Sequence, residues 1–251
     1  MNNKNRSIIY IESYVFMIVI NTLSILLPFG GQTVAQVSQN YESLFTPSPY
    51  AFSIWGLIYL LLLGFIIFQA QPKNQDSEAL AQIGWLFPLS CLLNSLWLIA
   101  WQNEWLPLSV YIIISLLITL IMIYTRLQSI TLSPKETLFV RLPFSIYTAW
   151  VSVAVVANIS AYLAAVGFDG FGLSDTYWAC IMIVAVTFLG IAILYQYQDI
   201  AFVLVLVWAL IAVANRQADS SAIVITTWMS VIAIVIIALL VNIFMGKKSN
   251  N

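Results

Sequence analysis

The chain contains no histidine. Histidine is the side chain most often used as a general base or metal ligand near neutral pH. Its absence excludes a histidine base, metal ligation by imidazole and axial haem coordination by histidine. No other pairing of a nucleophile with a base is visible in the sequence. An enzyme is therefore not favoured, although a reaction that needs none of these groups stays open.

Charge is also scarce, since Asp, Glu, Lys and Arg make up only 8% of the residues. Soluble domains carry roughly 25% charged residues, so this chain cannot cover a water-facing surface. The net charge is −1 and no basic patch occurs, so nucleic acid is not an expected partner. Stretches without charge are long enough for the roughly 20 apolar residues of a membrane-spanning helix. They are residues 13–41, 43–72, 79–103, 105–125, 142–168, 176–198 and 220–246, with a shorter one at 200–215.

These runs predict an all-α, polytopic transmembrane helix bundle. They are too long and continuous for the strands of a membrane barrel, the only other structure that satisfies its backbone in lipid. The predicted spans are residues 8–27, 50–70, 81–101, 105–125, 140–162, 177–196, 199–215 and 222–245.

The basic residues support this count. With eight spans and a cytoplasmic N-terminus, Arg216 alone lies outside, whereas cytoplasmic connections are normally enriched in Lys and Arg. The inside set is Lys4, Arg6, Lys73, Arg126, Lys135, Arg141, Lys247 and Lys248. We therefore expect an integral protein of a bacterial cell (inner) membrane, with both termini in the cytoplasm.

A few polar residues inside or beside the spans have predicted roles. Cys91 and Cys180 both fall within spans, so we expect buried thiols and no disulfide. Glu12 lies near the cytoplasmic interface, where an ion pair with Arg141 is one interpretation. Asp199 begins the seventh helix, where a carboxylate interacts favourably with the helix dipole.

One connection is long, from Phe29 to Pro49, with glycines at its start and prolines at its end. Loops of about 20 residues are uncommon in compact domains and are often functional. Two interpretations stay open, a lid over a binding site and a mobile connector.

Polar and aromatic residues recur at helical spacing on three spans, the second, third and fifth. At about 100° per residue, each set shares one helix face, and all three sets lie toward the outer surface beneath the long connection. The sets are Phe52, Trp55 and Tyr59; Ser90, Asn94, Trp97 and Trp101; and Tyr147, Trp150, Ala154 and Asn158. Their convergence predicts a pocket with flat aromatic walls, two amides and space beside Ala154, suited to a planar apolar ligand.

A simpler interpretation competes with the pocket. Tryptophan is enriched at bilayer interfaces, and asparagines often form hydrogen bonds between membrane helices. The tryptophans near span ends, which fit such an aromatic belt, are Trp85, Trp101, Trp105 and Trp178.

The same residues resemble the TspO/MBR (translocator protein, tryptophan-rich sensory protein) family. The motifs are Leu93-Asn94 followed by Trp97, the segment YTAWVSVAVVAN, and a proline-rich lead into Trp55 and Tyr59. Val153 stands where the family has phenylalanine, and Ser48 separates two prolines that are adjacent in the family. The motifs cover about residues 8–162, so residues 1–165 are predicted as a TspO-like five-helix domain and 166–251 as a three-helix C-terminal extension.

The resemblance implies a bundle that binds a porphyrin or a similar flat ligand beneath the first loop. Its wall would include Trp55, Asn94, Trp97, Trp150, Ala154 and Asn158, with no metal site and no assigned cofactor. We therefore expect a ligand-binding or sensor protein whose partners are the lipid bilayer and a planar apolar small molecule. A membrane carrier for a small amphipathic molecule is the alternative, and a homodimer is left open.

Overall fold

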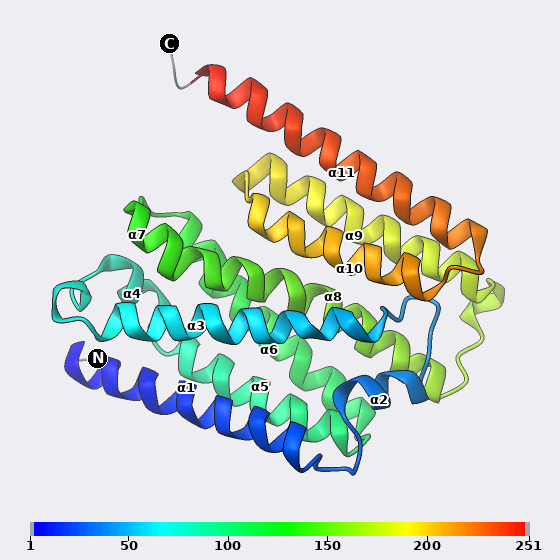
Figure 1. Ribbon diagram of the computed structural model, residues 1–251, viewed down its shortest axis with the longest axis horizontal. Helices are drawn as coiled ribbons and strands as arrows, with labels where there is room; N and C mark the ends of the chain where they lie inside the picture. The colour runs from blue at the N-terminus through cyan, green and yellow to red at the C-terminus, as the bar shows by residue number, and fades with distance from the viewer. Residues whose placement is uncertain (1–2, 249–251) are drawn as a thin grey trace.

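The computed structural model describes residues 3–248, and within them every regular element is helical (Figure 1). The α-helices are α1 (Asn3–Leu26), α2 (Val34–Asn40), α3 (Ile54–Ala70), α4 (Glu78–Ile83), α5 (Leu86–Gln102), α6 (Leu106–Gln128), α7 (Pro134–Glu136), α8 (Leu142–Ala165), α9 (Asp175–Tyr197), α10 (Ile200–Arg216) and α11 (Ser221–Lys248). Short turns of other helix types are η1 (Pro49–Ser53), η2 (Pro72–Asn74), η3 (Thr137–Arg141) and η4 (Gly170–Gly172).

Six helical segments in the described residues are long and apolar enough to cross a bilayer. They are Asn3–Leu26, Pro49–Ala70, Leu106–Gln128, Pro134–Ala165, Asp175–Tyr197 and Ser221–Ile243. The two remaining apolar helices, α5 and α10, have 17 residues each, which is the lower end of the spanning range. Both lie side by side with the longer helices (Figure 1). The protein is therefore a polytopic helical membrane protein, as predicted.

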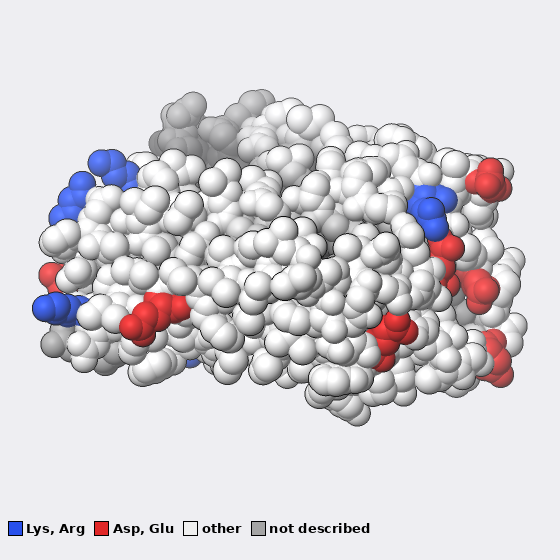
Figure 2. All heavy atoms as spheres, turned by 60° about the horizontal axis from the view of Figure 1, so that its bottom comes forward, with Lys and Arg blue, Asp and Glu red and all other residues white. Residues whose placement is uncertain are grey.

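Charged side chains gather toward the two ends of the bundle and leave an uncharged band between them (Figure 2). We call one end the acidic end; it carries Glu42, Glu104, Asp169, Asp175, Asp219 and the single basic residue Arg216 among the described residues. The opposite, basic end carries Lys73, Arg126, Lys135 and Arg141, together with the start of α1. The band between them is the part that hydrocarbon can cover.

Two predicted spans begin differently in the structure. The third span does not start at 81, because Gly84 adopts a φ of +49° and separates α4 from α5. The second span starts with the 3₁₀ turn η1, whose first residue is Pro49, and becomes α-helical only at Ile54. Proline at the first position of a helix loses no hydrogen bond, so it marks the start of this helix.

The helices form two groups that meet along α10. In one group, α1, α3, α5, α6 and α8 pack together; in the other, α9, α10 and α11 pack on one another (Figure 1). The joint between them is the packing of α10 along α8. Near the basic end, the first group is filled by rings, with Phe87 5.0 Å from Tyr10 and 5.1 Å from Phe65 between centroids.

Asp199 fixes the beginning of α10 to the first group of helices. Its Oδ1 accepts a hydrogen bond from the backbone N–H of Phe202 at 3.0 Å, which confirms the predicted helix cap. Its Oδ2 accepts from the hydroxyls of Ser145 at 2.7 Å and Tyr124 at 3.1 Å, and from Nε2 of Gln128 at 3.4 Å. One carboxylate therefore holds α6, α8 and α10 together.

Other polar predictions have mixed outcomes. Cys91 is a buried free thiol, as expected, whereas Cys180 is a free thiol that is only half-buried. The suggested ion pair of Glu12 with Arg141 is wrong, because the Arg141 guanidinium donates to the carbonyl oxygens of Leu127 at 3.0 Å and Ile130 at 3.3 Å. Those carbonyls lie at the end of α6, where backbone acceptors lack helical partners.

We expect Asp199→Ala to lower the free energy of unfolding by about 2–4 kcal/mol, because it removes a helix cap and leaves buried donors without their charged acceptor. Thermal unfolding in detergent, followed by circular dichroism, measures the effect. Asp219→Ala removes an exposed carboxylate and is the control. Equal unfolding midpoints for the two variants would contradict the role given to Asp199.

Candidate ligand pocket

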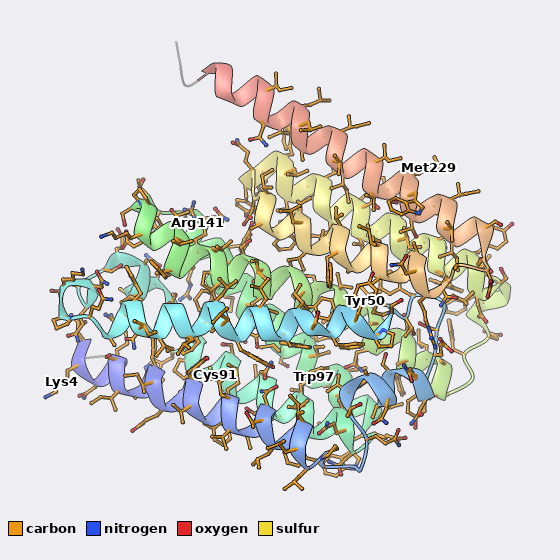
Figure 3. The ribbon with its side chains drawn as sticks, in the orientation of Figure 1. Lys4, Tyr50, Cys91, Trp97, Arg141 and Met229 are labelled. Atoms are coloured by element: carbon orange, nitrogen blue, oxygen red, sulfur yellow. The ribbon has the colours of Figure 1, made fainter. Side chains whose placement is uncertain are left out.

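Trp55 lies at the centre of a cluster of rings contributed by three helices. Its ring centroid is 5.7 Å from Tyr59 on α3, 5.8 Å from Trp97 on α5, and 5.9 Å from Tyr147 and 6.3 Å from Trp150 on α8. Trp97 points into the bundle between α3 and α5 (Figure 3), and only 5% of it is exposed. The predicted convergence of the three ring-bearing faces is therefore present.

A cavity of about 30 Å³ lies beside this cluster, toward the acidic end. Seven of the eleven residues in the three predicted sets line it: Phe52, Trp55, Trp97, Trp101, Trp150, Ala154 and Asn158. The other lining residues are Val34, Ser38, Pro47, Val153 and Ala157, so no charged side chain borders the cavity. The space holds about one water molecule, whereas pockets for small molecules measure roughly 300–1,000 Å³. A flat ligand can enter only if the surrounding groups move apart.

The four remaining predicted residues, Tyr59, Ser90, Asn94 and Tyr147, do not line the cavity. The Tyr59 hydroxyl donates to Oδ1 of Asn21 at 2.5 Å, and Nδ2 of Asn21 donates to Oδ1 of Asn94 at 2.9 Å. Asn21 is not among the predicted site residues. The signal was available, since Asn21 is an amide within the uncharged part of the first span.

Asn158 connects three helices at the edge of the cavity. Its Oδ1 accepts from Nε1 of Trp97 at 2.8 Å, and its Nδ2 donates to Oγ of Ser109 at 2.9 Å. The simpler interpretation of the asparagines is therefore partly correct, because Asn158 and Asn94 both form hydrogen bonds between helices. Asn158 also borders the cavity, so the two roles coexist in one residue.

Three buried polar groups in the ring cluster make no hydrogen bond of normal geometry: Nδ2 of Asn94, which faces the Tyr147 hydroxyl, that hydroxyl itself, and Nε1 of Trp150. The exposed fractions of these residues are 1%, 0% and 2%, respectively. A buried donor without an acceptor costs about 1–3 kcal/mol. Nε1 of Trp150 belongs to a residue that lines the cavity, so it is matched by a ligand that brings a hydrogen-bond acceptor there.

The long connection, residues 29–49, forms a structured lid over the cavity. Its helix α2 begins with a capping box in which Thr33 and Gln36 satisfy each other's backbone N–H groups. Val34, Ser38 and Pro47 of this lid line the cavity. Of the two open interpretations of this connection, the packed arrangement is the one that the structure has.

Residues of α5 and of the turn after it hold the lid against the bundle through hydrogen bonds. Nε1 of Trp101 donates to the carbonyl oxygen of Val34 at 3.1 Å. Glu104 accepts from Nε2 of Gln32 at 3.0 Å and from the Tyr41 hydroxyl. This hydrogen bond to Glu104 raises the pKa of Tyr41, because ionisation would remove the donated proton.

Trp101 is consequently not a residue of the interfacial belt, since it is only 4% exposed. Trp85 and Trp105 are 62% and 53% exposed, as the belt interpretation expects. Trp178 is half-buried, and its Nε1 donates to the carbonyl oxygen of Gly170 at 2.7 Å. The structure thus separates pocket tryptophans from interfacial ones, which periodicity alone did not do for Trp101.

A family model for TSPO-like proteins matches residues 7–241. The chain belongs to the TSPO-like family. Neither a curated protein nor a solved structure matches it. The match runs through α9 and α10 and into α11. In this TSPO-like protein it therefore also covers most of residues 166–251, the segment predicted as a C-terminal extension.

We expect Asn158→Leu to lower the free energy of unfolding by about 1–3 kcal/mol, because Trp97 and Ser109 would lose their partner in a buried site. Thermal unfolding in detergent measures this loss. Asn242→Leu is a matched control, because Asn242 is exposed on α11 and bonds only within its own helix. A loss of the same size in both variants would argue against the interhelical role of Asn158.

Proposed function

We propose that this TSPO-like protein binds a planar, largely apolar ligand of the tetrapyrrole type and acts as a membrane ligand-binding or sensor protein. The ligand would lie between α3, α5 and α8, beneath the lid. The observation that carries the proposal is the ring cluster around Trp55, which combines flat apolar surfaces with the buried, unpartnered Nε1 of Trp150. This combination suits a flat molecule that has acceptor atoms at a few positions.

The residues of the cavity favour such a ligand on chemical grounds. Indole rings from three helices offer faces for stacking, and aromatic pairs prefer offset or edge-to-face geometry at 4.5–7 Å. Ala154 and Ala157 on α8 leave room where a larger side chain would fill the cavity. Because no charged group borders the cavity, ionised substituents of the ligand would have to remain near the acidic end of the bundle.

Binding is favoured over transport by the continuity of the helices around the cavity. Many carriers place their substrate at helices that are broken near the middle of the bilayer. Here α5 and α8 run without interruption past the ring cluster, and α3 begins within it, directly after η1. Carriage of a small amphipathic molecule remains the alternative, and ligand-dependent flux into proteoliposomes would favour it.

We also propose that the basic end faces the cytoplasm of a bacterial cell, which places both termini there and the lid outside. The support is the distribution of basic residues, since Arg216 is the only one at the acidic end among the described residues.

Added protoporphyrin should quench the intrinsic fluorescence of the protein, and Trp150→Phe should weaken its affinity about five- to tenfold. The substitution keeps an aromatic ring but removes the unpartnered N–H donor, a loss of the order of 1 kcal/mol. Fluorescence titration in detergent gives the dissociation constants. Ala154→Phe should abolish binding, because the new ring would occupy the cavity.

Trp228→Phe is the matched control for this titration. Trp228 is 45% exposed on α11, so the same substitution removes one fluorophore without touching the pocket. Unchanged affinity in both Trp150→Phe and Ala154→Phe would rule out this site.

The orientation is tested by single cysteines at positions 135 and 219 in a background with Cys91→Ala and Cys180→Ala. A membrane-impermeant maleimide should label Asp219→Cys in intact cells and Lys135→Cys only after the cells are opened. The reverse pattern would place the basic end outside.

A further inference from the structure

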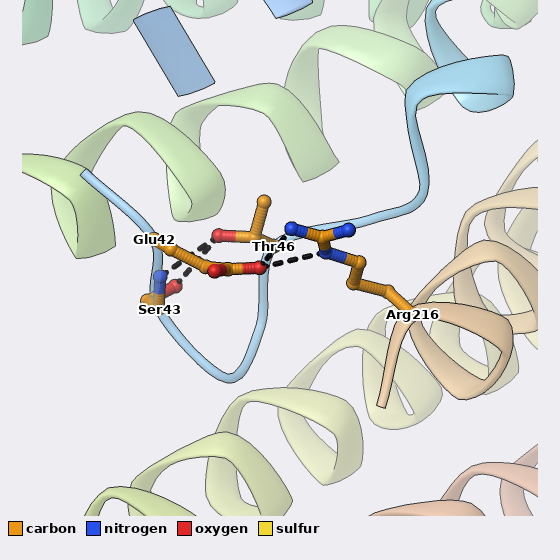
Figure 4. Close-up of polar contacts among 4 residues, drawn as sticks. All are labelled: Glu42, Ser43, Thr46 and Arg216. Carbon is orange, nitrogen blue, oxygen red and sulfur yellow. Dashed lines mark hydrogen bonds and ion pairs between the residues drawn. The ribbon is translucent and has the colours of Figure 1, made fainter. Parts of the chain in front are cut away.

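Helix α10 contacts the lid and the start of the second span through one face. The guanidinium of Arg216 forms an ion pair with the Glu42 carboxylate, with Nη2 and Nε at 2.5 Å and 2.7 Å from Oε1 (Figure 4). Next to Glu42, the backbone N–H of Ser43 donates to Oγ1 of Thr46 at 2.9 Å, which closes the turn that presents the carboxylate. The backbone N–H of Ser48 donates to the carbonyl oxygen of Ala212 at 3.0 Å.

Two further contacts extend this line to η1. Nδ2 of Asn215 donates to the Tyr50 hydroxyl at 3.0 Å, and Nε1 of Trp208 donates to the carbonyl oxygen of Ala51 at 3.3 Å. The rings of Tyr50 and Trp208 meet edge to face, 5.2 Å apart. Figure 3 places Tyr50 at the start of α3, beside α10. These contacts come from one face of α10, at positions 208, 212, 215 and 216. Position 212 is four residues from 208 and three or four residues from 215 and 216, and residues at such spacings are neighbours on a helix surface.

The contribution of α10 to the site is therefore indirect. No residue after Asn158 lines the cavity. The side chains on α10 instead contact the segment that carries the lid into α3. At its other end α10 is held by Asp199 to α6 and α8, so it is a fixed support rather than a mobile arm.

The ion pair with Glu42 also explains why Arg216 lies at the acidic end. It is the one basic residue that departs from the inside bias of the others, and it lies where it can pair with the lid carboxylate. Both partners are partly exposed, with side-chain exposures of 33% and 43%. Water can compete for such a pair, so the contact can break and re-form without unfolding the bundle.

We infer that α10 is a latch for the lid, and that the α9–α11 group sets how often the lid opens. Two separate steps are involved. The first, that α10 holds the lid, is independent of any ligand. The second, that opening governs ligand entry, rests on the proposed function, because the closed cavity of about 30 Å³ has no room for a flat ligand.

Hydrogen–deuterium exchange of backbone amides in residues 34–48, measured by mass spectrometry on the full chain, tests the first step. Arg216→Gln should raise the exchange rate about two- to fivefold, since one exposed ion pair is lost. The triple variant Trp208→Phe/Asn215→Ala/Arg216→Gln should raise it at least about tenfold, because three side-chain contacts are removed together. Amides of α5 should keep their wild-type rates in both variants.

Two controls make the result specific. Asp219→Asn removes a charge from the same end of the bundle and should leave lid exchange unchanged. Each single charge reversal, Glu42→Arg or Arg216→Glu, should speed hydrogen–deuterium exchange in the lid. The double variant, which swaps the two charges, should restore the slow exchange of the wild type. Wild-type exchange of residues 34–48 in the triple variant would overturn the latch.

Stopped-flow quenching by protoporphyrin tests the second step on the same variants. In the triple variant, the association rate constant of protoporphyrin should rise by about the same factor as the exchange rate of the lid amides. Faster exchange with an unchanged association rate would overturn the gating step. If protoporphyrin bound neither the wild type nor the variants, the proposed ligand would be wrong, and the exchange result would still decide the latch.

Discussion

The structure depends on one constraint: inside a bilayer, a buried polar group must find its partner within the protein, because no water is available there. Trp97, Asn158 and Ser109 satisfy this constraint across α5, α8 and α6. Asp199 does the same for α6, α8 and α10 at the basic end. These few polar groups fix how otherwise uniform apolar helices pack.

Local patterns in the sequence were enough to predict the helices and their shared faces. A period of 100° per residue places Asn94 with Trp97 and Trp150 with Asn158, and apolar length identifies each span. Helix starts were less predictable, because a single residue decides them, as Gly84 does between α4 and α5. Trp101 shows a further limit. Its place near a span end suggests an interface, and only the packing of the lid reveals that it is buried.

Contacts between distant parts of the chain were not predictable from one sequence. Asn21 and Asn94 are separated by 73 positions, and Glu42 and Arg216 by 174. Periodicity describes one helix at a time and carries no information about which helix lies opposite. The motifs predicted the C-terminal helices as an extension of a five-helix unit but not how the two connect, which is through contacts of α10 with both ends of that unit.

The uncharged lining of the cavity has a consequence for regulation by acidity. Its members are apolar, indole, hydroxyl and amide side chains, and none of these gains or loses a proton near neutral pH. The interior surface therefore presents the same chemistry in acidic and in neutral surroundings. Any sensitivity of this pocket to protons therefore has to originate outside its lining.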